Sequence, residues 1–408
     1  MGDYMDVRNR DIGRRVGYWR SRRGLTRQQF ADLVDRSISW VDKVESGQRG
    51  LVRLPMLEAV ANALQIDVAA LTDDDAARRA AESPDAVEVC AIRDALCSYK
   101  VIFDGAGEAP DPVRLRRQVD YACAAWLASH LTTMGRVLPG LIAESQRAVA
   151  TLDGFNRVEA ARHLVMAYRL ASSTLLKLDT IELAWLAADR AMLTARSVGD
   201  TVCLARASRC VARALACLGQ PRDSLDVLIA MATRMEPELA SQDRQLLSMY
   251  GMLLLPAEIA AAQKGDVDTA LTMHRRAEQI ARQLGPGYCD PVSAFGVTNV
   301  ALHRLAALVR MDEGGRAVTY ARTIEPQSLA RLPRERKATY LLDMAEAHRQ
   351  CRQYPEAAAA VVRADQVAPE EVRRRPATHA LIRRLLDVAS GEPALLLRRL
   401  ADRASVAT

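Results

Sequence analysis

The sequence predicts an all-α protein, because of its composition and because loop-like breaks recur between long helical stretches. Only 4% of the 408 residues are aromatic, alanine and leucine dominate, and runs of β-branched residues are scarce. Such a composition favours helices that pack through small side chains over β-sheets. Half of the residues are hydrophobic, and single hydrophobic cores stop growing near ~250–300 residues. We therefore expect at least two domains.

An N-terminal domain is expected to begin with an amphipathic helix. Ile12, Val16 and Trp19 share one helical stripe within residues 11–23. Gly24 follows at a position where a positive φ costs little, and ends the helix. The domain is therefore predicted to open with a helix of about three turns.

Two further helices follow, and each starts at a capping residue. Thr26 and Gln29 have the spacing of a capping box, which opens the second helix. Ser37 caps a third helix, from Ile38 to Ser46. Asp35 and Arg36 form a tight turn between them. A turn this short lets the second and third helices meet only at a steep angle.

Positive charge is concentrated in this N-terminal region. Between Arg8 and Arg53, twelve Arg or Lys residues outweigh five Asp or Glu residues, a net charge of +7, whereas the whole chain carries +6. The remainder of the chain is therefore close to neutral. A small basic module on a neutral body is typical of a nucleic-acid-binding protein. For the charge taken alone, an ordinary solvated face remains the alternative.

The segment GLTRQQFADLVDRSISWVDKVESGQR, with its flanks, resembles the phage-repressor-like, or XRE, helix-turn-helix family over about residues 9–72. The resemblance implies that Ala31 is the small residue at the helix crossing, and that Val41 and Val44 hold the third helix in the core. It also implies an ion pair between Arg20 and Glu45. The remaining apolar positions predict a fourth and a short fifth helix: Leu54, Leu57, Val60, Ala61 and Leu64, then Val68 to Leu71.

The same resemblance implies that the third helix lies in the major groove of double-stranded DNA. The side chains that would contact bases are Ile38, Ser39, Asp42 and Lys43. Backbone amides at the start of the second helix would receive a phosphate. Further phosphate contacts are expected from Arg27, Gln48, Arg49 and Arg53. Ile38 could equally pack against the protein instead of touching a thymine methyl group.

Three positions depart from the family pattern. Arg27 stands where glutamine is usual, Asp35 where the turn usually has glycine, and Arg36 where an apolar residue is common. Aspartate tolerates the left-handed conformation that glycine adopts there, so the turn is expected to form. Trp40 is expected to pack in the core or against its own backbone, with insertion between bases as the less favoured alternative.

The rest of the chain is predicted to be an array of helical hairpins. We place the DNA-binding domain at residues 1–72, a polar linker at 73–86 and the array at 87–408. The breaks are TTMGR (132–136), KLDT (177–180), GQPR (219–222), KGDV (264–267), DEGG (312–315) and QYPE (353–356). They recur about every 41–48 residues, which is typical of a helical-repeat protein.

Residues 257–285 and 343–369 resemble tetratricopeptide repeats, lengthened beyond the standard repeat. Small residues stand where two helices of a repeat approach closely: Ala261, Ala270, Ala277, Ala347, Ala357 and Ala364. Another α-solenoid remains the alternative. A repeat superhelix offers a concave groove for a peptide, small-molecule or protein effector. Candidate groove residues are Tyr250, Asn299, His303 and Tyr340.

No catalytic site or cofactor is expected. The six histidines form no HExxH motif, and neither a Walker A nor a GxSxG motif occurs. The eight cysteines form no CxxC pair, which argues against a zinc site or a disulfide framework. Cys203, Cys210 and Cys217 recur every seven residues, either as a redox cluster or, as we favour, as small core residues.

These observations predict a sequence-specific DNA-binding transcriptional regulator that forms a homodimer and recognises an inverted repeat. The excess of 51 Arg over 5 Lys indicates GC-rich coding DNA, so we expect a bacterial protein. The N-terminus lacks an apolar signal region, and the longest mostly apolar stretch, residues 252–262, is too short to span a bilayer. We therefore expect a cytoplasmic protein with no membrane partner.

A helix-turn-helix followed by helical repeats is an architecture found in several kinds of regulator. It resembles peptide-sensing regulators of bacterial quorum systems and regulators within antibiotic-biosynthesis clusters, which is an analogy of architecture alone. The alternative function is an interaction adaptor, in which the repeats scaffold a complex and the helix-turn-helix binds DNA weakly or not at all.

Overall fold

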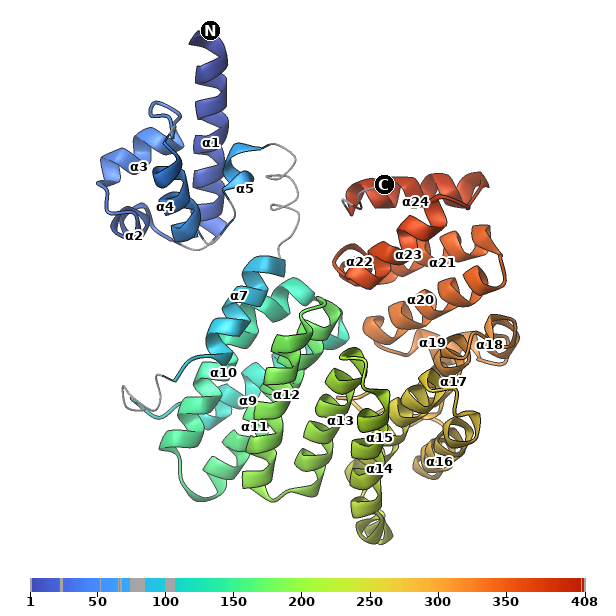
Figure 1. Cartoon of the computed structure of the whole chain (residues 1–408). Helices are drawn as coiled ribbons and strands as arrows, with labels where there is room; N and C mark the ends of the chain where they lie inside the picture. The colour runs from blue at the N-terminus through green and yellow to red at the C-terminus, as the bar shows by residue number, and fades with distance from the viewer. Residues whose placement is uncertain are drawn as a thin grey trace. The chain divides into compact units, whose positions relative to one another are not determined.

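The computed structural model describes residues 2–22, 25–51, 53–64, 66, 68–73, 85–99, 107–404 and 406. Over these residues the chain is all-α, as predicted. It divides into two compact units, Met1–Val87 and Glu88–Thr408 (Figure 1). Most of the predicted linker, together with Gly24, lies outside the described residues.

The N-terminal unit contains the five predicted helices. They are α1 (Gly2–Arg22), α2 (Arg27–Leu33), α3 (Ile38–Glu45), α4 (Leu54–Leu64) and α5 (Ala69–Thr72). Their apolar faces form one core, whose most buried members include Ile12, Val16, Trp19, Phe30, Val41, Val44, Val60 and Leu64. Leu54 was expected on the apolar face of α4, but it is 59% exposed because it begins the helix, one turn before the buried positions.

Close approach of α1 and α3 fixes the position of the third helix. A Cβ atom added at Gly13 would lie 2.1 Å from the carbonyl oxygen of Val44, so only glycine fits there. The turn before α3 places Asp35 at φ 52°, in the left-handed region that the sequence predicted for it. These two features hold α3 against α1 and α2, with one side of α3 left exposed.

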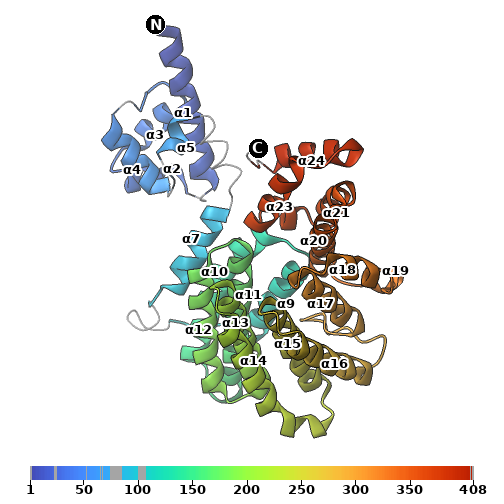
Figure 2. The same cartoon turned by 45° about the vertical axis from the view of Figure 1, so that its right-hand side comes forward.

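The C-terminal unit is a succession of helical hairpins (Figures 1 and 2). After α7 (Asp85–Leu96), the hairpins are α9/α10 (Pro112–Leu127, Leu131–Thr151), α11/α12 (Gly154–Lys177, Ile181–Val198), α13/α14 (Thr201–Cys217, Pro221–Met235), α15/α16 (Arg244–Gln263, Val267–Leu284), α17/α18 (Val297–Arg310, Gly314–Ala321), α20/α21 (Arg334–Gln350, Tyr354–Val367) and α23/α24 (Pro376–Leu386, Gly391–Arg403). Short connecting helices are η1 (Glu236–Ser241), α19 (Pro326–Ala330) and α22 (Pro369–Arg373).

The first six hairpins turn in the same way, through one left-handed residue two positions beyond the first helix. These residues are Ser129, Asp179, Gly219, Gly265, Asp312 and Arg352. Five of the six predicted breaks coincide with these turns or adjoin them. The sixth, TTMGR at residues 132–136, was wrong, because it lies inside α10. Its Gly135 serves close packing instead, since a Cβ atom there would lie 2.1 Å from the Cβ of Glu88.

The hairpins form two layers. The first helices, α9, α11, α13, α15, α17 and α20, contact one another in sequence, and each second helix packs on its own hairpin. The six small residues predicted at the helix crossings are fully buried: Ala261, Ala270, Ala277, Ala347, Ala357 and Ala364. Among the described helices, α15 alone is long and apolar enough to cross a membrane, and 78% of its apolar window is buried by its neighbours, as in an ordinary core helix.

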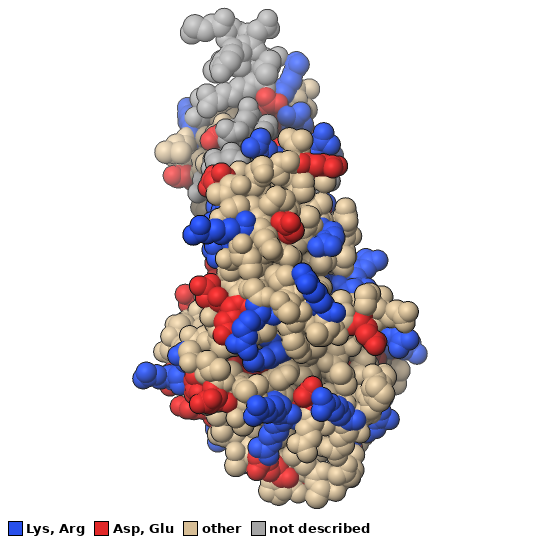
Figure 3. Space-filling view, turned by 90° about the vertical axis from the view of Figure 1, so that its right-hand side faces the viewer, with Lys and Arg blue, Asp and Glu red and all other residues tan. Residues whose placement is uncertain are grey.

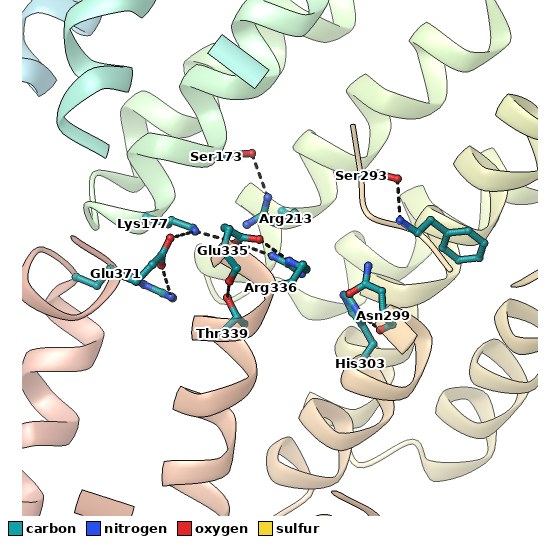
Figure 4. Close-up of polar contacts among 12 residues, drawn as sticks. Ser173, Lys177, Arg213, Ser293, Asn299, His303, Glu335, Arg336, Thr339 and Glu371 are labelled. Atoms are coloured by element: carbon teal, nitrogen blue, oxygen red, sulfur yellow. Dashed lines mark hydrogen bonds and ion pairs between the residues drawn. The ribbon is translucent and has the colours of Figure 1, made fainter. Parts of the chain in front are cut away.

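Side chains of the last hairpins contact the first ones. Glu370 at the start of α22 accepts hydrogen bonds from the backbone N–H (2.7 Å) and hydroxyl (3.0 Å) of Thr132 at the start of α10. The Lys177 ammonium, at the end of α11, forms ion pairs with Glu335, at 2.8 Å, and with Glu371 (Figure 4). We call these five residues the closing cluster, because they join the first two hairpins to α20 and α22.

Candidate nucleic-acid interface

One side of α3 is held firmly in the core of the N-terminal unit. The Ser37 hydroxyl accepts a hydrogen bond from the backbone N–H of Trp40 at 3.2 Å, which caps the helix. Trp40, Val41 and Val44 are buried, with exposed fractions of 7%, 0% and 1%. The core position expected for Trp40 is thus the one observed. Because these three residues fix the rotation of α3, its opposite side has a defined orientation.

The opposite side of α3 presents the four residues for which base contacts were predicted. Ile38, Ser39, Asp42 and Lys43 are all exposed and lie on one face of the helix. Ile38 is 41% exposed, so it is available for an apolar contact instead of packing fully in the core. The face therefore combines an apolar group, a hydroxyl, an acid and a base within one and a half turns, and each of these is a kind of group that can contact base edges in the major groove.

An ion-pair network lies at the C-terminal end of α3. The Glu45 carboxylate accepts hydrogen bonds from Nε of Arg20 at 2.5 Å and from Nε of Arg27 at 3.0 Å. The side chains of Arg20 and Glu45 are only 14% and 9% exposed. Burial disfavours the charged carboxylate, but the hydrogen bonds and charges of the two arginines outweigh it and lower the pKa of Glu45. Glu45 thus connects α3 to α1 and α2.

Arg27 has a role that the sequence did not indicate. Its guanidinium also pairs with Asp42, at 3.1 Å between Nε and Oδ1, and the Arg27 side chain is 54% exposed. The hydrogen bond to Glu45, with the charges of Glu45 and Asp42, raises the pKa of Arg27. The residue predicted to contact a phosphate and the residue predicted to contact a base therefore form an ion pair with each other.

The remaining residues predicted to contact phosphates surround this face. Gln48, Arg49 and Arg53 are exposed. The backbone N–H of Arg49 donates to the carbonyl oxygen of Lys43 at 2.8 Å, which ties the loop to the end of α3. At the start of α2 the predicted capping box is present, with both of its hydrogen bonds made between Thr26 and Gln29. The start of α2 is exposed, so its free amides can meet a phosphate.

Of the four candidate groove residues of the C-terminal unit, two line a cavity and two are fully buried. His303 and Tyr340 line a cavity of about 500 Å³ between the first helices of the hairpins. Burial, with the charge of Arg336, lowers the pKa of His303 to about 3, so it is neutral at neutral pH. Tyr250 and Asn299 are fully buried and belong to the packing between helices. Figure 4 shows Asn299 beside His303 on α17.

The cysteine pattern on α13 reflects packing. Cys203 and Cys210 are buried, whereas Cys217 is exposed. Seven residues along a helix rise ~10 Å, too far for a disulfide. Burial raises the pKa of the Cys203 thiol to about 11 and also raises that of Cys210, which makes both poor nucleophiles. No group of histidine, cysteine or acidic residues suited to a metal ion occurs within the described part of the chain.

Three arginines that face the interior of the array were not predicted from the sequence. Arg206, Arg209 and Arg213 follow one face of α13 and line cavities of the C-terminal unit. The signal was their spacing of three and four residues, which places them together on a helix. That spacing alone does not distinguish a groove from an outer surface. On the outer face seen in Figure 3, basic and acidic side chains are interspersed.

A comparison with protein families agrees with the geometry of the N-terminal unit. Residues 11–74 match the model of a family described as helix-turn-helix domain, whereas curated protein sequences give no match. A crystal structure of Bacillus thuringiensis PlcR in complex with the peptide PapR7 and DNA matches 67% of this chain and 95% of its own, at 16% identity and a TM-score of 0.33. Similarity this low does not transfer the partners of PlcR. The capped α2 and α3, the short turn between them and the family match show that residues 11–74 are a helix-turn-helix domain.

Proposed function

We propose that this chain is a sequence-specific, DNA-binding transcriptional regulator of the bacterial cytoplasm. The observation that carries the proposal is the geometry of α3. Its buried side and the Arg20–Glu45 pair fix the helix, while Ile38, Ser39 and Lys43 point outward together. A helix held this way on a small basic domain fits the major groove of DNA.

Selection of DNA from a random pool by the full-length protein tests this function. We expect enrichment of a short inverted repeat with half-sites roughly one helical turn, ~10 bp, apart, because a two-fold dimer presents two copies of α3. If the pool after several rounds is no richer in any sequence than at the start, the chain is an adaptor with weak or vestigial DNA binding, and the proposal is wrong.

Substitutions on and beside α3 should separate DNA positioning from base reading. Arg49→Glu is expected to weaken binding to all sequences alike and to flatten the dependence of affinity on salt concentration, because one phosphate contact is lost. Lys43→Ala is expected to change which sequence is preferred. Affinities of both variants for a set of related operators, measured at several salt concentrations, test this. Identical behaviour of the two variants would contradict the assigned roles.

Dimerisation is assigned to the array of hairpins. One helix-turn-helix domain makes too few contacts for nanomolar specificity, so two copies must be held together. We expect residues 87–408 to form a homodimer, and residues 1–75 to be largely monomeric and to bind DNA poorly at physiological salt. Sedimentation of the two fragments measures this. A monomeric 87–408 beside a dimeric 1–75 would reverse the assignment.

An effector in the groove of the array would then control DNA binding through the dimer. A shift of a few ångströms between the two copies of α3 takes them out of register with successive major grooves. The effector needs to prefer one dimer geometry by only ~1.4 kcal/mol to change DNA affinity tenfold. Binding of the effector is thus proposed to act on the distance between the recognition helices and not on their own contacts.

A further inference from the structure

Three arginines form a stripe on the inner face of α13. Arg206, Arg209 and Arg213 stand three and four residues apart, so their side chains share one face of the helix. None of the three forms an ion pair with a carboxylate within the described part of the chain, and Arg213 donates a hydrogen bond to the Ser173 hydroxyl at 3.1 Å (Figure 4). Like charges this close repel one another, so the stripe is unfavourable unless an anion meets it.

A cavity of about 490 Å³ lies against this stripe, and we call it the arginine cavity. Arg206 and Arg209 line it from α13, and Arg169 lines it from α11. Arg169 is only 7% exposed, and its buried Nη1 has no hydrogen-bond partner among the described residues. Its guanidinium lies 5.7 Å from the ring centroid of Trp126, which orients it without neutralising its charge. A buried donor without an acceptor is costly, and an anion bound beside it would offset this cost.

The opposite wall adds a fourth arginine and one acid. Arg244 stacks over the ring of Tyr288 at 4.9 Å. Asp290 is the only carboxylate among the described lining residues, and its Oδ1 already accepts hydrogen bonds from the backbone N–H groups of Val292 (3.0 Å) and Ser293 (2.7 Å). Four arginines therefore line the cavity together with one acid, whose carboxylate is engaged in its own turn. The arginine cavity has a net positive charge.

The pKa shifts of Arg169 and Arg209 agree with a net positive charge in the arginine cavity. Burial lowers the pKa of Arg169, and the neighbouring arginines Arg206 and Arg213 lower it further. Burial, with the charges of Arg213 and Arg169, lowers the pKa of Arg209 well below its ordinary value. Since guanidinium groups stay protonated in proteins, the burial is a cost that an anionic ligand would offset.

Part of the cavity wall is apolar. Val202 projects from α13, and Met249 and Met252 project from α15, all lining the same space as the arginines. The volume is within the range of small-molecule sites, which combine apolar walls with a few placed polar groups. Methionine adapts its shape to varied apolar groups. The cavity thus offers an apolar wall beside a cluster of cations.

We propose that the arginine cavity binds a small amphipathic anion, whose carboxylate or phosphate group lies among Arg169, Arg206 and Arg209 and whose apolar part packs against the neighbouring wall. Carboxylate and phosphate both accept paired hydrogen bonds from guanidinium groups. Binding itself is independent of DNA, whereas the role of this anion as the effector rests on the proposed function.

Isothermal titration of the full-length protein, without DNA, tests the proposal with four probes: octanoate, octyl phosphate, 1-octanol and inorganic phosphate. We expect octanoate or octyl phosphate to bind at least roughly tenfold more tightly than 1-octanol and inorganic phosphate, because only they supply both parts. The stronger of the two identifies the anionic group. Equal binding of 1-octanol, or of inorganic phosphate alone, overturns the proposal. Affinity for the anionic probe should also fall as salt rises.

Variants locate the site. Arg206→Gln and Arg209→Gln are each expected to lower the affinity for the more tightly bound probe roughly tenfold or more. Arg275→Gln is the matched control, because Arg275 is exposed on α16 and does not line the cavity. Without probe, the two cavity variants should melt no lower than wild type, since each removes a repelling charge. If both cavity variants bind the probe as tightly as wild type, the probe does not bind in the arginine cavity and the proposal is wrong.

DNA selection by the same variants separates the two proposals. Arg206→Gln should enrich the same sequence as wild type in the absence of probe, since Arg206 lies in the array and not in the helix-turn-helix domain. If no sequence is enriched by any form of the protein while the probe binds, the proposed function fails and the anion site stands. If a sequence is enriched but neither amphipathic probe binds, the anion site fails alone.

Discussion

Replacement of Lys177 by methionine is expected to lower the free energy of unfolding of the C-terminal unit by ~3 kcal/mol, the lower end of the cost of breaking a buried ion pair, because Glu335 and Glu371 lose the ammonium that they share. The side chains of Lys177, Glu335 and Glu371 are 5%, 2% and 0% exposed. Arg336 and Arg375 still pair with the two acids after the change, which limits the loss. Urea unfolding of the full chain, followed by circular dichroism, measures the effect.

Lys264→Met is the matched control for this prediction, because Lys264 is exposed at the end of α15. It should change the unfolding midpoint little. The double variant Lys177→Met/Glu371→Gln should recover part of the stability, since it removes one of the two buried carboxylates that no longer contact an ammonium. A Lys177→Met chain as stable as the Lys264→Met chain would show that the closing cluster does not stabilise the array.

Glu45→Ala is expected to cost ~3 kcal/mol of stability in the N-terminal unit, because it leaves Arg20 partly buried without its carboxylate. Urea unfolding followed by the fluorescence of Trp19 and Trp40, in a chain with Trp126 and Trp185 replaced by phenylalanine, isolates this unit. Arg49→Ala is the control: Arg49 is exposed and lies outside the Arg20–Glu45–Arg27 network, so its loss should affect stability little. A Glu45→Ala variant that unfolds like wild type yet loses DNA binding would contradict the structural role of Glu45.

The contribution of Glu45 should also depend on pH. Because the folded state lowers the pKa of its carboxyl below the ordinary value of 4.5, the contribution is fully present above that value. It is lost as the pH falls through the lowered pKa of the folded state. The stability difference between wild type and Glu45→Gln should therefore shrink in acid and stay constant at neutral pH. A difference that grows as the pH falls would contradict this assignment.

Local signals in the sequence were sufficient for the helix-turn-helix domain. The capping residues Thr26 and Ser37 act within three residues of themselves, and Asp35 sets its own turn. Such signals depend on backbone geometry alone, so they can be read without the tertiary structure. The exposed face of α3 follows from the same periodicity that buries Val41 and Val44.

Contacts between distant residues could not be predicted in this way. Gly135 looked like part of a loop because glycine disfavours helices, but in the fold it makes room for Glu88 in a different helix. Lys177 meets Glu371 across 194 residues of chain, and nothing local specifies such a pair. The spacing of the three arginines on α13 predicts that they share one face of the helix. Whether this face lies inside the array depends on the curvature of the array, which the local sequence does not specify.

The closing cluster changes the connectivity of the array from a line to a ring. In a linear repeat protein, each hairpin contacts only its neighbours, and the terminal hairpins can fray independently. Here Glu370 and Glu371 of α22 hold the start of α10 and the end of α11, so the array is closed between its first two hairpins and α22, and α23/α24 extends beyond this closure. Local expansion at one hairpin cannot be relieved by spreading the ends apart, and it must instead be shared around the whole circuit. Such a ring transmits a small displacement at any one hairpin to all the others.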